Sequence, residues 1–164
     1  MATQKSTNIT AFDATPFSRV DARLAGGVVK SIVDTFELTD TADADVAIVA
    51  KVPVDGIPLS IKFACDDLGT AGTVDIGLFY KAADGTYTVV DADAFANNID
   101  VNSAAVALTE YRFSAKGIET AMQNFWTLSG LSARPDYNEM YIGLTTDTGT
   151  TADGTVTIQI QYTE

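Results

Sequence analysis

A chain of 164 residues, 46% of them apolar, is long enough to form one domain with a sizeable buried core. Its 10 basic and 22 acidic residues give a formal net charge of −12, which argues against binding to nucleic-acid phosphates or to an anionic membrane surface. The sequence holds no histidine, which excludes Ser-His-Asp and Cys-His nucleophiles, the usual zinc sites and the commonest general base at neutral pH.

The first 27 residues are polar, with Phe12 and Phe17 as isolated aromatic side chains ahead of the Gly26-Gly27 pair. They lack the apolar core of a secretory signal, and no apolar run in the chain approaches the roughly 18 residues of a membrane span. Residues 1–30 carry a formal charge of +2, so the rest of the chain carries −14. We interpret residues 1–27 as an extended arm, either frayed or laid against another chain, and residues 28–164 as one domain.

Four segments after the double glycine alternate with the period of two that is typical of half-buried strands. The side chains predicted to face the core are Val46, Ile48, Ala50 and Val52; Ile57, Leu59, Ile61, Phe63 and Cys65; Val74, Ile76, Leu78 and Tyr80; and Val156, Ile158, Ile160 and Tyr162. Strands with one polar face are common in antiparallel sheets and rare in parallel ones. The pattern therefore predicts an all-β, antiparallel fold.

One segment has the spacing of a helix instead. Its apolar side chains fall at i, i+4, i+7 and i+8, on one stripe: Ile118, Met122, Phe125 and Trp126. Ser114 is a suitable N-cap, and Gly130 a suitable residue to end the helix. We predict one short helix near residues 115–128 that packs over one end of a sheet.

A short motif occurs twice. Ile-Gly-Leu at 76–78 is followed by Asp-Gly-Thr at 84–86, and Ile-Gly-Leu at 142–144 is followed by Asp-Gly-Thr at 153–155. Each copy predicts a strand, an Asp-Gly turn and a second strand, so the same hairpin is used twice. Two hairpins favour a two-sheet sandwich over a solenoid, which needs three or more repeats. The mid-strand glycines are expected to admit a neighbouring backbone or a bulky side chain.

The stretch FACDDLGTAGTVDIGLF contains the chain's single cysteine. Cys65 continues the apolar face of its strand, and the negative charges of Asp66 and Asp67 disfavour a thiolate, so we interpret Cys65 as a buried structural residue. LGTAG lacks the lysine and the following helix of a phosphate loop and predicts a turn. Asp66 and Asp67 are expected to be loop acids, and they are the best candidates for binding an ion. The acidic residues near them do not have the spacing of a known calcium-binding loop.

Two other functions stay open on the residues alone. Four tyrosines can stack on sugar rings, although strand edges and interfaces are their commoner setting: Tyr87, Tyr111, Tyr137 and Tyr141. A pair of carboxylates for glycoside hydrolysis is not marked by any spacing among the 22 acidic residues. No reaction and no cofactor is therefore predicted.

The sequence between Asp43 and Asp91 resembles that of small virion structural proteins of tailed bacteriophages, particularly from marine and cyanobacterial hosts. The matching pieces are Asp45 to Val49, Pro53 to Lys62, Asp66 to Gly69 and Val74 to Phe79. Residues 101–137, VNSAAVALTEYRFSAKGIETAMQNFWTLSGLSARPDY, are similar to the same class, in which a helix interrupts the strands. The resemblance covers about residues 30–164.

That class includes capsid decoration (cement) proteins, which are often jelly-roll or related β-sandwiches bound as trimers on the outer head surface. The resemblance implies a jelly-roll-like sandwich, a non-enzymatic role, a homotrimer, the major capsid protein as partner, and a place on the virion after synthesis in the bacterial cytoplasm. The arm residues expected to contact the capsid are Phe12, Phe17, Arg19 and Arg23. The alternatives are a carbohydrate-binding or host-attachment β-sandwich displayed on the virion and, less favoured, an acid-pair hydrolase.

Overall fold

The computed structural model describes residue 16 and residues 27–39, 41–102 and 104–164. Its eight strands are β1 (Val29–Leu38), β2 (Val46–Pro53), β3 (Ile57–Cys65), β4 (Thr73–Lys81), β5 (Tyr87–Asp100), β6 (Val106–Glu110), β7 (Glu139–Thr148) and β8 (Gly154–Thr163). A 3-10 turn, η1 (Ile118–Thr120), and a one-turn helix, α2 (Phe125–Leu128), interrupt the connection between β6 and β7. The predicted arm, residues 1–27, lies almost entirely outside the described residues.

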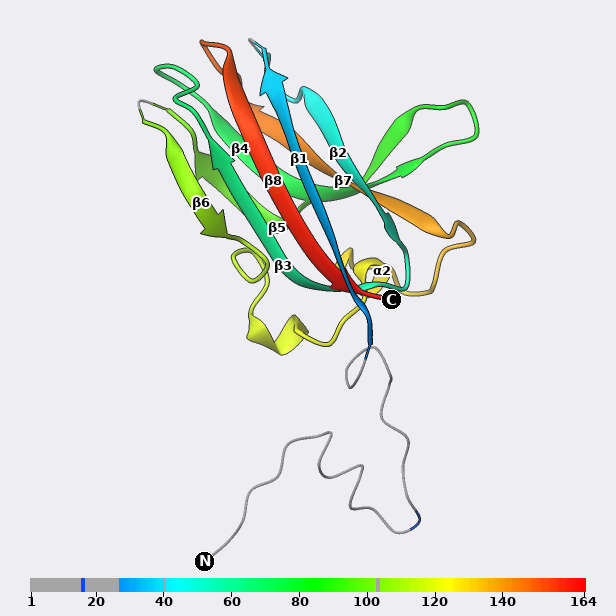
Figure 1. Ribbon diagram of the computed structural model, residues 1–164. Helices are drawn as coiled ribbons and strands as arrows, with labels where there is room; N and C mark the ends of the chain where they lie inside the picture. The colour runs from blue at the N-terminus through cyan, green and yellow to red at the C-terminus, as the bar shows by residue number, and fades with distance from the viewer. Residues whose placement is uncertain (1–15, 17–26, 40, 103) are drawn as a thin grey trace, which may run out of the picture.

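The strands form two four-stranded antiparallel sheets that face each other (Figure 1). One sheet has the order β1-β8-β3-β6 and the other the order β2-β7-β4-β5. Chain-order neighbours mostly lie in different sheets, and the two orders together are those of an eight-stranded jelly roll. The prediction of an antiparallel, jelly-roll-like β-sandwich is confirmed.

The core lies between the two sheets, and β8 shows most simply how the sequence builds it. Val156, Ile158 and Ile160 are fully buried and Tyr162 nearly so, while the residues between them face outward. β8 pairs with β1 and β3 on its two sides, and its pairing with β1 runs in unbroken register over ten residues. A strand with two partners and a regular ladder keeps its period of two, so the prediction for β8 is confirmed.

Bulges break the predicted alternation in two other strands. The register of β2 shifts between Ile48 and Ala50, and the adjacent Val49 and Ala50 are both buried instead of alternating. The register of β3 shifts between Pro58 and Ser60, which leaves Leu59 exposed instead of buried. An extra residue in one strand inverts the side-chain pattern beyond it, and apolar spacing does not reveal where the extra residue sits.

The predicted helix is shorter than its apolar stripe. Only Phe125–Leu128 is α-helical, and the side chain of Asn124, not Ser114, caps it by accepting a hydrogen bond from the backbone N–H of Thr127. Gly130 ends this turn with a positive φ of 75°, as expected. Phe125 is fully buried, but Ile118 is 77% exposed, so the stripe does not form one buried face. No helix among the described residues is long and apolar enough to cross a membrane.

The repeated motif forms one hairpin, not two. β4 and β5 pair across the turn at residues 82–86, where Thr86 N–H donates to the carboxylate of Asp84. β7 and β8 lie in different sheets, so the second Asp-Gly step is part of a crossover and the second hairpin was wrongly predicted. The jelly-roll order separates them because β8 pairs with β1 and β3 while β7 pairs with β2 and β4.

Candidate interaction surface

The loop after β3 is a packed turn rather than a reactive site. Cys65 is buried at the end of β3, and burial raises the pKa of its thiol, with a smaller contribution from the charges of Asp66 and Asp67. Asp67 Oδ1 accepts a hydrogen bond from Gly69 N–H at 2.9 Å, and Asp66 Oδ2 accepts one from Thr155 N–H at 3.2 Å. Both aspartates therefore serve the turn, as expected of loop acids.

The same loop shows why glycine is needed at position 69. Gly69 has a φ of +107°, and a Cβ on it would lie 2.0 Å from Thr151 Oγ1. Between the aspartates and the glycine, Leu68 is fully buried and its carbonyl accepts hydrogen bonds from the N–H groups of Thr151 and Ala152. Among the residues that the structure describes, no three cysteine, aspartate or glutamate side chains gather where they could hold a metal ion.

One end of the sandwich exposes large apolar side chains. β1 begins, β8 ends and β3 begins there, since Val29 and Ile57 both pair with Thr163. The connection from β6 to β7, yellow in Figure 1, passes the same end. We call this end the terminal face, and its exposed apolar residues are Val28, Val29, Leu59, Phe113, Ile118 and Met122. Arg112 donates to both Pro58 O and Thr120 O, which brings the start of β3 with Leu59 next to the segment that carries Ile118 and Met122. A contiguous exposed apolar patch is characteristic of a surface that binds another molecule.

A buried arginine holds the terminal face in place. Arg112 is fully buried, and its guanidinium donates from Nε to Pro58 O (2.9 Å) and from Nη2 to Thr120 O (2.9 Å). Nη1 lies 3.3 Å from Thr120 Oγ1. Burial lowers the pKa of Arg112 to about 10, so the side chain stays charged at neutral pH. The clamp ties residues 111–121 to the start of β3.

Neighbouring side chains extend this support. Glu110 Oε1 accepts hydrogen bonds from the backbone N–H groups of Ile61 (2.8 Å) and Arg112 (2.9 Å). The Arg112 guanidinium carbon lies 4.7 Å from the centre of the Phe113 ring, which is 37% exposed. Lys116 forms an ion pair with Asp91 and donates to the carbonyl of Leu128. The segment that carries Phe113 and Ile118 is therefore held in place by buried and partly buried hydrogen bonds.

The structure describes the predicted tyrosines but not the predicted arm residues. The arm residues expected to contact a capsid lie outside the described residues: Phe12, Phe17, Arg19 and Arg23. Of the tyrosines considered for sugar stacking, Tyr137 stacks on Tyr80 with ring centres 5.1 Å apart, and Tyr87 packs edge-on against Tyr141. Tyr111 packs edge-on against the buried Phe63 and so belongs to the margin of the core.

Sequence reasoning missed the Arg112 clamp and the terminal face. An arginine between Tyr111 and Phe113 reads as an ordinary surface cation, because its acceptors are backbone carbonyls and a hydroxyl that no residue pattern marks. Ile118 and Met122 were assigned to a helix stripe facing the core. The one usable signal was the Gly117 that precedes them, a poor residue for a helix interior.

Two solved structures have similar folds. A chain of the cyanophage Pam1 capsid asymmetric unit matches with a TM-score of 0.51 and 20% identity, over 84% of this chain and 85% of that chain. A chain of the capsid of Ralstonia phage GP4 matches with a TM-score of 0.53 and 17% identity, over 82% of this chain and 84% of that chain. No protein-family model matches the sequence, and no curated protein sequence does. At these identities the likeness shows a shared fold over nearly the whole of each chain.

Proposed function

We propose that this chain is a non-enzymatic virion structural protein of a phage, a decoration or cement protein that binds the outside of a shell built by a different, major capsid protein. The observation that carries the proposal is its fold, shared over more than four fifths of both chains with chains of two phage capsids. The virion-protein resemblance of residues 30–164 supports it independently of that comparison.

The terminal face is the part of the body that would contact the shell. It exposes large apolar side chains on a scaffold fixed by Arg112, and residues 1–27 join the body there through Val28 and Val29. Arm and terminal face would thus act together on one partner, with Phe12, Phe17, Arg19 and Arg23 supplying arm contacts.

Stabilisation of the shell follows from mass action. A protein that binds only the assembled shell lowers the free energy of that state by an amount that grows with its concentration relative to the dissociation constant. Three copies joined in a trimer bind more tightly than one, because the first contact raises the effective concentration of the other two. Sedimentation equilibrium at micromolar protein is expected to give three times the 17.3 kDa chain mass.

Co-sedimentation with empty, expanded heads of the same phage tests the proposal. We expect saturable pelleting of the wild-type chain, and no pelleting at micromolar protein would overturn the decoration role. The double variant Ile118→Asp, Met122→Asp should stay folded, because these side chains are 77% and 48% exposed, and should lose pelleting. Leu108→Asp is the matched control, since Leu108 is 52% exposed on β6 outside the terminal face.

Deletion of residues 1–27 tests the arm separately. We expect pelleting to be lost while circular dichroism still reports a folded β-sandwich. Full retention of pelleting by this variant would refute the arm contacts and leave the terminal face as the shell-binding surface.

A further inference from the structure

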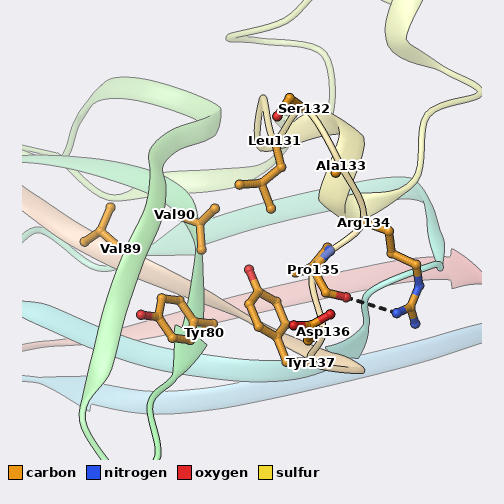
Figure 2. A pocket seen from close by; sticks show the side chains of 10 residues that line it. All are labelled: Tyr80, Val89, Val90, Leu131, Ser132, Ala133, Arg134, Pro135, Asp136 and Tyr137. Carbon is orange, nitrogen blue, oxygen red and sulfur yellow. Dashed lines mark hydrogen bonds between the residues drawn. The ribbon is translucent and has the colours of Figure 1, made fainter.

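A groove lies between the β4–β5 hairpin and residues 131–137, the segment that leads into β7. Its volume is about 580 Å³, within the range of ligand sites, and its lining includes Tyr80, Val90, Leu131, Arg134, Asp136 and Tyr137. Figure 2 shows the Tyr137 ring between Tyr80 and Pro135, with its hydroxyl directed toward Leu131. The groove thus combines an aromatic wall with apolar side chains and a few polar groups.

The walls of the groove are fixed before any ligand binds. The rings of Tyr80 and Tyr137 are stacked, 5.1 Å between centres and 3° from parallel. Arg134 holds the other side, because Nε and Nη2 donate to both carboxylate oxygens of Asp55 at 2.8–3.0 Å. It also donates to Pro135 O and Asn138 Oδ1, each at 3.0 Å. A preformed site loses little conformational entropy when it binds a ligand.

The charges of the groove select against an anionic ligand. The guanidinium of Arg134 is neutralised by the paired carboxylate of Asp55, and its donors are already engaged. Asp136 adds a further negative charge to the lining, and the whole chain carries −12. Phosphate, sulfate and carboxylate ligands would therefore meet net repulsion.

The size and the surface chemistry point to one class of neutral ligand. A specific protein partner needs roughly 1,200 Å² or more of total interface, whereas a groove of about 580 Å³ has the size of a small-molecule site. A pyranose ring has apolar C–H faces that pack on an aromatic or aliphatic wall and a rim of hydroxyls that hydrogen-bond. The tyrosine hydroxyls, Ser132 and the Asp136 carboxylate are suitable partners for that rim. We infer that this groove binds an uncharged oligosaccharide of two or three hexose units.

Isothermal titration and saturation-transfer NMR of the isolated protein, with maltotriose, cellotriose and N,N′,N″-triacetylchitotriose as probes, test the inference. We expect one of the three to bind saturably below about 10 mM, a range normal for short sugars. Tyr137→Ala should weaken binding at least about tenfold, while Tyr137→Phe, which keeps the stacked ring, should weaken it less. Ala133→Trp should block the groove without touching the core, because Ala133 is exposed.

Tyr87→Ala is the matched control, since Tyr87 is 42% exposed and packs on Tyr141 outside the groove lining. Saturation by none of the three probes at about 10 mM would overturn the inference. Equal binding by wild type and Ala133→Trp, or an equal loss in Tyr87→Ala and Tyr137→Ala, would do the same. The measurement uses no heads, so its outcome is independent of the decoration role.

Discussion

Gly77 of β4 lies directly opposite Gly143 of β7, so the two Ile-Gly-Leu motifs pair with each other across adjacent strands. A Cβ on Gly77 would lie 2.2 Å from the carbonyl oxygen of Ala92, in the bulged part of β5. A Cβ on Gly143 would lie 2.7 Å from the ring of Phe79, which is fully buried. One glycine admits a backbone and the other an aromatic ring, as the sequence predicted for mid-strand glycines.

Gly77→Ala is therefore expected to destabilise the protein more than Gly143→Ala. The clash at Gly77 is with backbone held in a sheet, and the cost should exceed about 3 kcal/mol; a ring can shift slightly, and Gly143→Ala should cost about 1–3 kcal/mol. Urea unfolding followed by tryptophan fluorescence measures both. Equal losses would show that the bulge in β5 yields as readily as the Phe79 ring.

Arg112→Lys should loosen the terminal face. A lysine cannot supply the planar fork that reaches Pro58 O and Thr120 O together, and we expect a loss of about 2–4 kcal/mol in unfolding free energy. Hydrogen exchange should speed up most in residues 113–123. Lys51→Ala removes an exposed ion pair with Glu139 and should leave stability nearly unchanged. Unchanged exchange in Arg112→Lys would contradict the clamp.

Asp75→Asn should stabilise the protein at neutral pH. Partial burial, together with the charges of Asp147 and Asp93, raises the pKa of Asp75 above its ordinary 3.8. The folded state then keeps a proton that the unfolded state has lost, so stability falls as pH rises through the range just above 3.8. The asparagine removes that loss and can still accept the Asn98 N–H bond, so its advantage should appear at pH 7 and vanish near pH 3.

Asp84→Asn is the control with the opposite sign. Hydrogen bonds from Thr86 to the Asp84 carboxylate lower its pKa, so its contribution to stability is present above 3.8 and lost as pH falls. Asp84→Asn should therefore reduce stability at pH 7, and this reduction should shrink as pH falls below 3.8. Thermal melts of both variants between pH 3 and pH 7 measure these opposite changes in stability. If both variants shifted the melting temperature in the same direction at pH 7, the pKa directions given for Asp75 and Asp84 would be contradicted.

Cys65 should resist alkylation in the folded protein. Its side chain is only 5% exposed, and burial raises the pKa of the thiol, which reduces the reactive thiolate. Iodoacetamide at about pH 8 should label it only after urea is added, as read by intact-mass spectrometry. Labelling within minutes in native buffer would contradict the buried position.

The fold class followed from the sequence because the strongest signals come from strands with regular ladders. Val156, Ile158, Ile160 and Tyr162 alternate without interruption, and the structure buries all four. Where the pattern failed, a local irregularity was responsible. A bulge exposes Leu59, and Phe79 is buried on the outward face of β4 because Gly143 leaves room for its ring.

The long-range features were harder to read. The second Asp-Gly step looked like a hairpin turn, but whether the next strand stays in the same sheet is decided by partners that are distant in the chain. Ile118 and Met122 have helical spacing, but the Arg112 guanidinium donates to both Pro58 O and Thr120 O. These hydrogen bonds hold the backbone around Thr120 in a conformation other than a continuous helix. The usual rule that apolar side chains are buried also fails here, because Ile118 and Met122 are exposed.

The placement of the last two strands has a consequence for biosynthesis. β8 sits between β1 and β3, and β7 sits between β2 and β4, so each sheet receives a central strand only from residues 139–163. While those residues are still inside the ribosome, β1 has no strand to pair with and β2 has none either. Neither sheet can be completed before β7 and β8 have left the ribosome, so the long-range pairing of both sheets waits for these two strands.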